Sequence, residues 1–115
     1  MIPGATIPGE AYRPLLAAVQ AAFPGQVWGC ATAGWTNNFP NPLEIKGQVE
    51  QCLAGAAELG LPTETVFYAG HSLGGVVLET FLRPNADLAA GMALLGTWLP
   101  DLLGRQAVES TMQYE

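Results

Sequence analysis

Basic residues are scarce in this chain, which has four Lys plus Arg against ten Asp plus Glu among 115 residues. Its formal net charge is −6 at pH 7. A protein that binds nucleic acid needs clustered cations to hold the phosphate backbone, and four cations cannot supply such a cluster. The same imbalance disfavours electrostatic docking on an anionic membrane. We therefore expect no nucleic acid partner and no electrostatic docking on a membrane surface.

Histidine and cysteine are also scarce, and this limits the metal and redox chemistry that the chain can carry. His71 is the only histidine, and Cys30 and Cys52 are the only cysteines. Their spacing matches no metal-ligand motif, so neither a metal site nor another cofactor is expected. The first residues contain no charged segment followed by an apolar one, so no secretory signal is visible. We therefore expect two reduced thiols in the core and an intracellular location.

Long apolar runs are absent as well, so an integral membrane span is not expected. Half of the residues are hydrophobic and 12% are charged, a composition typical of a largely buried framework. A length of 115 residues allows one domain at most. Because no repeat, low-complexity tract or linker divides the sequence, we expect a single soluble domain.

Apolar runs alternate with helical patterns along the chain. The predicted helices, with apolar residues at spacings of three and four, cover residues 10–23, 43–60 and 73–82. The predicted strands cover residues 26–31, 65–69 and 91–96. The last strand is a continuous apolar run, as expected of a strand buried on both faces. This alternation predicts an α/β fold in three layers, with a mostly parallel sheet between helices.

The most specific motif lies between the second predicted strand and the third predicted helix. Residues 70–74 read Gly-His-Ser-Leu-Gly, which is Gly-x-Ser-x-Gly in a strand–turn–helix context. A strand that reverses into a helix so abruptly forces a strained backbone at the serine, and the flanking glycines permit close packing. The hydroxyl of Ser72 then stands at the tip of the turn, and the N–H of Leu73 can point at a developing oxyanion. Ser72 is therefore a predicted nucleophile.

Residues 70–75 resemble the form that is common in lipases and esterases of the α/β-hydrolase superfamily. The resemblance extends over nearly the whole chain. It implies a serine hydrolase that acts on a carboxylic ester or lipid-like acyl substrate through an acyl-enzyme on Ser72. Acyltransferase relatives share the same turn, so hydrolysis and acyl transfer both stay open.

The resemblance also implies that residues 1–115 form one partial hydrolase domain. In the family's order, Ile2 would end the third strand and residues 91–96 would form the sixth, with further strands before Met1 and after Glu115. The third strand normally lies between the fourth and the fifth. Since only its end would be present, the neighbouring strands would keep open edges, and we expect self-association through them.

The family's catalytic triad runs along the chain from the serine to an acid and then to a histidine. His71 adjoins Ser72 and is held beside the backbone of the turn, so we expect it to line the site rather than to act as the base. The triad histidine and acid would then lie outside this chain, although Asp101 is a candidate acid within it. The chain as written is therefore expected to be inactive or weakly active.

The second oxyanion donor of the family comes from the loop after the third strand. Here Pro3-Gly4-Ala5 occupies that loop, and Ala5 is the predicted donor, with an ordinary turn as the alternative. Aromatic residues follow the strand ends on the side of the serine, namely Trp35, Phe39 and Trp98. With His71 they predict a pocket for an acyl group, and the alternative is that the aromatic side chains belong to the core.

A function of a different class is also open, in which the protein keeps the fold as a non-catalytic binding or interaction module. The absence of any histidine besides His71 favours this alternative. The predicted strain at Ser72 argues against it, because a scaffold has no need of a strained serine.

Overall fold

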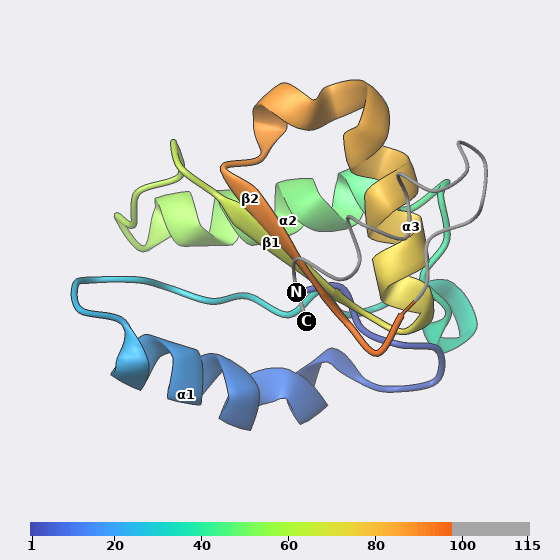
Figure 1. The fold of residues 1–115 in the computed structure, drawn as a ribbon, viewed down its shortest axis with the longest axis horizontal. Coiled ribbons are helices and arrows are strands. Elements are labelled where there is room, and N and C mark those ends of the chain that lie inside the picture. Colours follow the sequence, from blue (N-terminus) through green and yellow to red (C-terminus); the bar gives the residue numbers. More distant parts are fainter. Residues whose placement is uncertain (98–115) are drawn as a thin grey trace.

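The computed structural model describes residues 1–97, and its elements follow the predicted alternation in outline (Figure 1). The helices are α1 (Arg13–Ala22), α2 (Ile45–Glu58) and α3 (Leu73–Leu82), and the strands are β1 (Phe67–His71) and β2 (Gly91–Leu95). Short 3-10 helices cover Gly9–Tyr12, Thr36–Asn38 and Arg83–Leu88. Within this described part, no helix has the length and apolar character needed to cross a membrane. The fold is mixed α/β, as the sequence pattern predicts.

β1 and β2 form a two-stranded parallel sheet in which Phe67 lies opposite Gly91. Ile2 continues the sheet on the other side of β1. Its N–H donates to the Ala69 carbonyl oxygen at 2.7 Å, and its carbonyl oxygen accepts from the His71 N–H at 3.0 Å. The first residues of the chain are thus bound to the strand that leads into Ser72.

Residues 26–31 do not form a strand, contrary to the prediction. Within residues 1–97, the backbone hydrogen bonds between this region and the sheet run through Met1. The Met1 amino group donates to the Cys30 carbonyl oxygen at 2.8 Å, and the Thr32 N–H donates to the Met1 carbonyl oxygen at 3.0 Å. A strand needs a longer run of such bonds along its neighbour. The order across the sheet is nevertheless the Cys30–Thr32 region, Met1–Ile2, β1 and β2.

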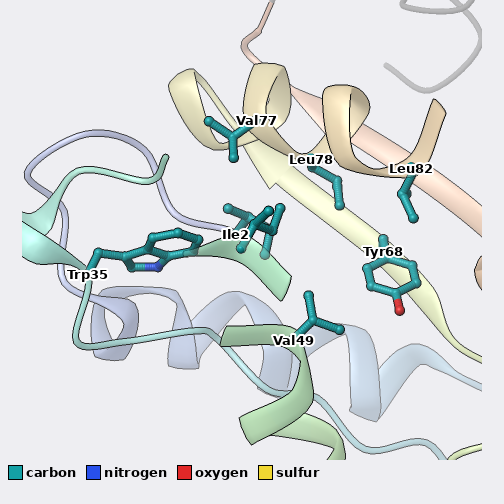
Figure 2. Close-up of a cluster of buried hydrophobic side chains, with 8 residues drawn as sticks. Ile2, Trp35, Val49, Tyr68, Val77, Leu78 and Leu82 are labelled. Carbon is teal, nitrogen blue, oxygen red and sulfur yellow. The ribbon is translucent and has the colours of Figure 1, made fainter. Parts of the chain in front are cut away.

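The core lies where α2 and α3 meet one face of the sheet (Figure 2). Its buried side chains are Ile2, Trp35, Ile45, Val49, Tyr68, Val77, Leu78 and Leu82. Leu78 is fully buried and Ile2 is 1% exposed, and burying a side chain of this size contributes about 1.5–3 kcal/mol. Because Ile2 belongs to this core and also pairs with β1, the segment that follows it is held close to the start of α3.

The opposite face of the sheet is less covered than the sequence predicts. Of the residues of β2, only Leu94 is buried, so the prediction of a strand buried on both faces is wrong. An open cavity of about 560 Å³ runs along the sheet and is lined by residues of α1, of both strands and of α2, among them Val19, Phe67 and Leu53. Phe67 at its edge is 74% exposed, and Leu15 and Val19 of α1 are also exposed. Helix α1 therefore leaves this face partly uncovered within residues 1–97, and the expected self-association stays a prediction.

Cys30 and Cys52 form a disulfide, so the expectation of two reduced thiols is wrong. Their Cα atoms are 6.0 Å apart, which lies within the range that a disulfide spans. The bond ties the region beside Met1 to helix α2. The pairing depends on how α2 packs beside the sheet, which cysteine spacing alone does not reveal.

Candidate active site

The turn between β1 and α3 holds Ser72 in a strained conformation. Ser72 has φ 52° and ψ −123°, a region that residues with a side chain rarely occupy, and such strain costs about 1–3 kcal/mol. Two hydrogen bonds hold it there. The Ser72 N–H donates to the Leu95 carbonyl oxygen at 3.0 Å, and the Thr97 hydroxyl donates to the Ser72 carbonyl oxygen at 2.5 Å. The strain predicted from the sequence is thus present, and β2 helps to enforce it.

Glycines around Ser72 allow the backbone segments to approach closely. A Cβ on Gly70 would lie 2.6 Å from the Gly75 Cα atom. A Cβ on Gly74 would overlap the Pro3 carbonyl oxygen and would lie 2.5 Å from the Ile2 carbonyl oxygen. The first turn of α3 therefore lies directly against the segment that leaves the sheet at Ile2.

The loop after Ile2, residues 3–7 (the Gly4 loop), lies beside Ser72. A Cβ on Gly4 would lie only 3.4 Å from the Ser72 Cβ atom. The Ile7 N–H donates to the Gly4 carbonyl oxygen at 3.3 Å, and Thr6 has φ 65°, so the loop closes as a tight turn. The Thr6 N–H is anchored on the Asn38 carbonyl oxygen at 2.7 Å. The loop that was predicted to carry the second oxyanion donor is thus adjacent to the predicted nucleophile.

Two backbone N–H groups next to Ser72 are candidates for holding an oxyanion. The Leu73 N–H belongs to the first residue of α3, where no intrahelical acceptor exists. The Ala5 N–H donates to no residue in the part of the chain that the structure describes. By contrast, the Gly4 N–H is already used, because it donates to the Tyr12 hydroxyl at 2.7 Å.

His71 is held beside the turn by Tyr12. Its Nδ1 atom lies 2.7 Å from the Tyr12 hydroxyl oxygen, and the two rings meet edge to face with centroids 5.8 Å apart. A Cβ on Gly4 would lie 3.1 Å from the same Nδ1 atom, so the imidazole packs against the Gly4 loop. Tyr12 was not predicted to be a site residue, because its only sequence signal was a place in an amphipathic helical pattern.

The remaining predicted site residues differ in their surroundings. Trp35 is 5% exposed and belongs to the core, where its indole N–H donates to the Thr32 hydroxyl oxygen at 3.0 Å (Figure 2). The core alternative therefore describes Trp35 better than the pocket alternative. Phe39 is 46% exposed. Trp98 and Asp101 lie outside the described residues.

The groups gathered at this site are a serine hydroxyl, backbone N–H donors and one imidazole that is engaged by a tyrosine. Among residues 1–97, no group of three or more His, Cys, Asp or Glu side chains is arranged to hold a metal ion. A serine hydroxyl with free backbone N–H groups nearby is an arrangement that can support acyl transfer. The chain was compared with models of protein families, with curated proteins and with solved structures, and none of them matches it.

Proposed function

We propose that this chain is a serine hydrolase of the α/β-hydrolase type, or part of one, that acts on carboxylic esters or lipid-like acyl substrates. The observation that carries the proposal is the backbone of Ser72, at φ 52° and ψ −123° between a parallel strand and a helix. A residue with a side chain keeps such a conformation only where its surroundings enforce it, and these positions cluster at functional sites.

In the proposed reaction the Ser72 hydroxyl oxygen attacks the carbonyl carbon of the ester while its proton passes to a base. The C=O electron pair moves onto the carbonyl oxygen, and this oxyanion accepts hydrogen bonds from the Leu73 and Ala5 N–H groups. Loss of one such donor costs about 2.7–4 kcal/mol of transition-state stabilisation in a serine hydrolase. The oxyanion then collapses, the C–O bond to the leaving group breaks, and the departing oxygen takes the proton from the protonated base. Water next attacks the carbonyl carbon of the acyl-serine and gives a proton to the base. The second oxyanion, held by the same N–H groups, collapses to release the carboxylic acid and the Ser72 hydroxyl. Acyl transfer to an acceptor alcohol would differ only in this last step.

The arrangement of the sheet supports the hydrolase type. The order across the sheet is Cys30–Thr32, Met1–Ile2, β1 and β2. The resemblance implies this position for Ile2, because residues 26–31 would correspond to the fourth strand and residues 65–69 to the fifth, with the third strand between them. Helices α2 and α3 pack in the core on one face of the sheet. Tyr12, at the start of α1, contacts His71 of β1. Both contacts favour an arrangement with helices on both faces of the sheet.

The base would be a histidine outside this chain, and Asp101 stays the candidate acid within it. A non-catalytic binding protein is the second candidate function, and one observation favours it. The only histidine of the chain has its Nδ1 atom engaged by Tyr12, so it is poorly placed to accept the proton of Ser72. Whether Ser72 reacts as a nucleophile distinguishes a hydrolase from a non-catalytic binding protein.

A fluorophosphonate probe is expected to label the chain slowly but selectively on Ser72, because the backbone N–H donors of the turn still favour attack by this hydroxyl when the triad base is missing. The variant Ser72→Ala should lose all labelling. Ser110→Ala is a matched control, since Ser110 is the only other serine of the chain, and it should label like the wild type. Labelling is read by gel fluorescence and by mass spectrometry of the modified peptide. Equal labelling of all three proteins, or labelling of none, would contradict the proposal.

Turnover by residues 1–115 alone is expected to be slow. A serine hydrolase without a triad member retains roughly 10³–10⁴-fold acceleration over water, from its oxyanion hole and substrate binding. Hydrolysis of a short-chain nitrophenyl ester, followed by absorbance, measures this. Fast turnover that persists in His71→Ala would mean that another residue of the chain serves as the base, and the proposed division of roles would then be wrong.

A further inference from the structure

Tyr12 lies where the Gly4 loop, the Ser72 turn and the start of α1 meet. Its side chain is buried, with 8% of the residue exposed. Its hydroxyl oxygen is 2.7 Å from the Gly4 nitrogen and 2.7 Å from the His71 Nδ1 atom. One hydroxyl therefore connects the two segments that flank the predicted nucleophile, which are separated by most of the described sequence.

The direction of these hydrogen bonds follows from counting protons. A backbone N–H can only donate, so the Tyr12 oxygen accepts from Gly4. The phenol has one proton of its own, and within residues 1–97 its contact with His71 offers the acceptor for it. With the phenol as the donor, Nδ1 of a neutral His71 accepts and the ring proton lies on Nε2. The reverse arrangement, in which Nδ1–H donates to the Tyr12 oxygen, would leave the phenol proton without an acceptor among residues 1–97.

We propose that Tyr12 is a positioning residue that holds the Gly4 loop and the imidazole of His71 in place beside Ser72. This inference rests on the proposed function. By occupying the Gly4 N–H, the Tyr12 hydroxyl leaves the Ala5 N–H as the donor that the loop can offer to substrate. By occupying Nδ1, it holds the imidazole against the Gly4 loop. The ring packs into the space that a side chain on Gly4 would take, because a Cβ built there would lie 3.1 Å from Nδ1.

Nuclear magnetic resonance of the wild-type chain tests the hydrogen bonds directly. His71 is the only histidine, so its ring nitrogens are assigned without ambiguity. For the neutral ring we expect an unprotonated Nδ1, a protonated Nε2 and slow hydrogen exchange at the Gly4 amide. A proton found on Nδ1, or a Gly4 amide that exchanges as fast as an exposed one, would overturn the inference. This measurement needs no activity and no variant.

The variant Tyr12→Phe removes the hydroxyl and keeps the ring that packs on His71. Exchange at the Gly4 amide should accelerate about 10-fold, the effect of losing one ordinary hydrogen bond, and the Nδ1 resonance should move toward that of an imidazole nitrogen without a donor. The matched control is Tyr68→Phe, because Tyr68 is also buried but makes no hydrogen bond through its hydroxyl with residues 1–97. Unchanged spectra in Tyr12→Phe would contradict the inference.

The rate of Ser72 labelling by the fluorophosphonate separates this inference from the proposed function. We expect a fall of roughly 10- to 100-fold in Tyr12→Phe, since small displacements of a catalytic group have effects of this size, and wild-type rates in Tyr68→Phe. If the wild type labels and Tyr12→Phe labels equally fast, Tyr12 is not a positioning residue although the proposed function stands. If wild-type Ser72 does not label, the proposed function fails and the positioning role fails with it, while the spectra still report whether the hydrogen bonds exist.

Discussion

Replacement of Gly74 by alanine is expected to lower the free energy of unfolding by about 3 kcal/mol and to abolish labelling of Ser72. The new Cβ would overlap the Pro3 carbonyl oxygen and lie 2.5 Å from the Ile2 carbonyl oxygen. Both are backbone atoms, and Ile2 is held by hydrogen bonds to Ala69 and His71. The strain therefore cannot be relieved by moving a flexible side chain, and the Gly4 loop must move away from the start of α3.

The same substitution at Gly55 is a matched control. Gly55 lies inside helix α2, and a Cβ there would meet no atom within 4 Å. Alanine is favoured over glycine in a helix interior, so Gly55→Ala should raise the free energy of unfolding by up to about 1 kcal/mol. Urea titrations followed by circular dichroism measure both variants. If Gly74→Ala is as stable as Gly55→Ala, the close contact between α3 and the Ile2–Pro3 backbone does not exist.

Loss of the Cys30–Cys52 disulfide is expected to lower the free energy of unfolding by about 3 kcal/mol. The bond closes a loop with a sequence separation of 22 residues, and its removal restores conformational freedom to the unfolded chain. It also frees the region beside Met1 from α2. Because Met1 precedes the Gly4 loop, which lies beside Ser72, we expect slower labelling of Ser72 in the reduced protein.

The double variant Cys30→Ser with Cys52→Ser provides the control for this experiment. A reducing agent should lower the urea midpoint of the wild-type chain and leave that of the double variant unchanged. The mass of the alkylated wild type, measured before and after reduction, shows whether the bond was present. Identical midpoints for the oxidised and reduced wild type would contradict the expectation. Disulfides persist mainly in oxidising compartments, and the intracellular location suggested by the sequence stays a prediction.

The conformation of the turn could be predicted from the sequence because it is local. Gly-x-Ser-x-Gly between an apolar run and a helical pattern specifies a strand that reverses directly into a helix, and Ser72 has the strained backbone that follows. Helix α3 has the predicted bounds, Leu73–Leu82, since the turn starts it and Arg83–Leu88 continues as a 3-10 helix that contains Pro84. Hydrophobic periodicity likewise predicted α2 within two residues at each end.

Contacts between distant segments were decided only by the tertiary structure. Tyr12 and His71 are 59 residues apart, and their hydrogen bond exists because Ile2 pairs with β1 and carries the Gly4 loop to the Ser72 turn. The disulfide depends in the same way on how α2 packs. Residues 26–31 have the composition of a strand, yet a strand is made by hydrogen bonds to its neighbours, which composition does not supply. Periodicity reports which face of an element is apolar, whereas the partner of that face is set by packing of the whole chain.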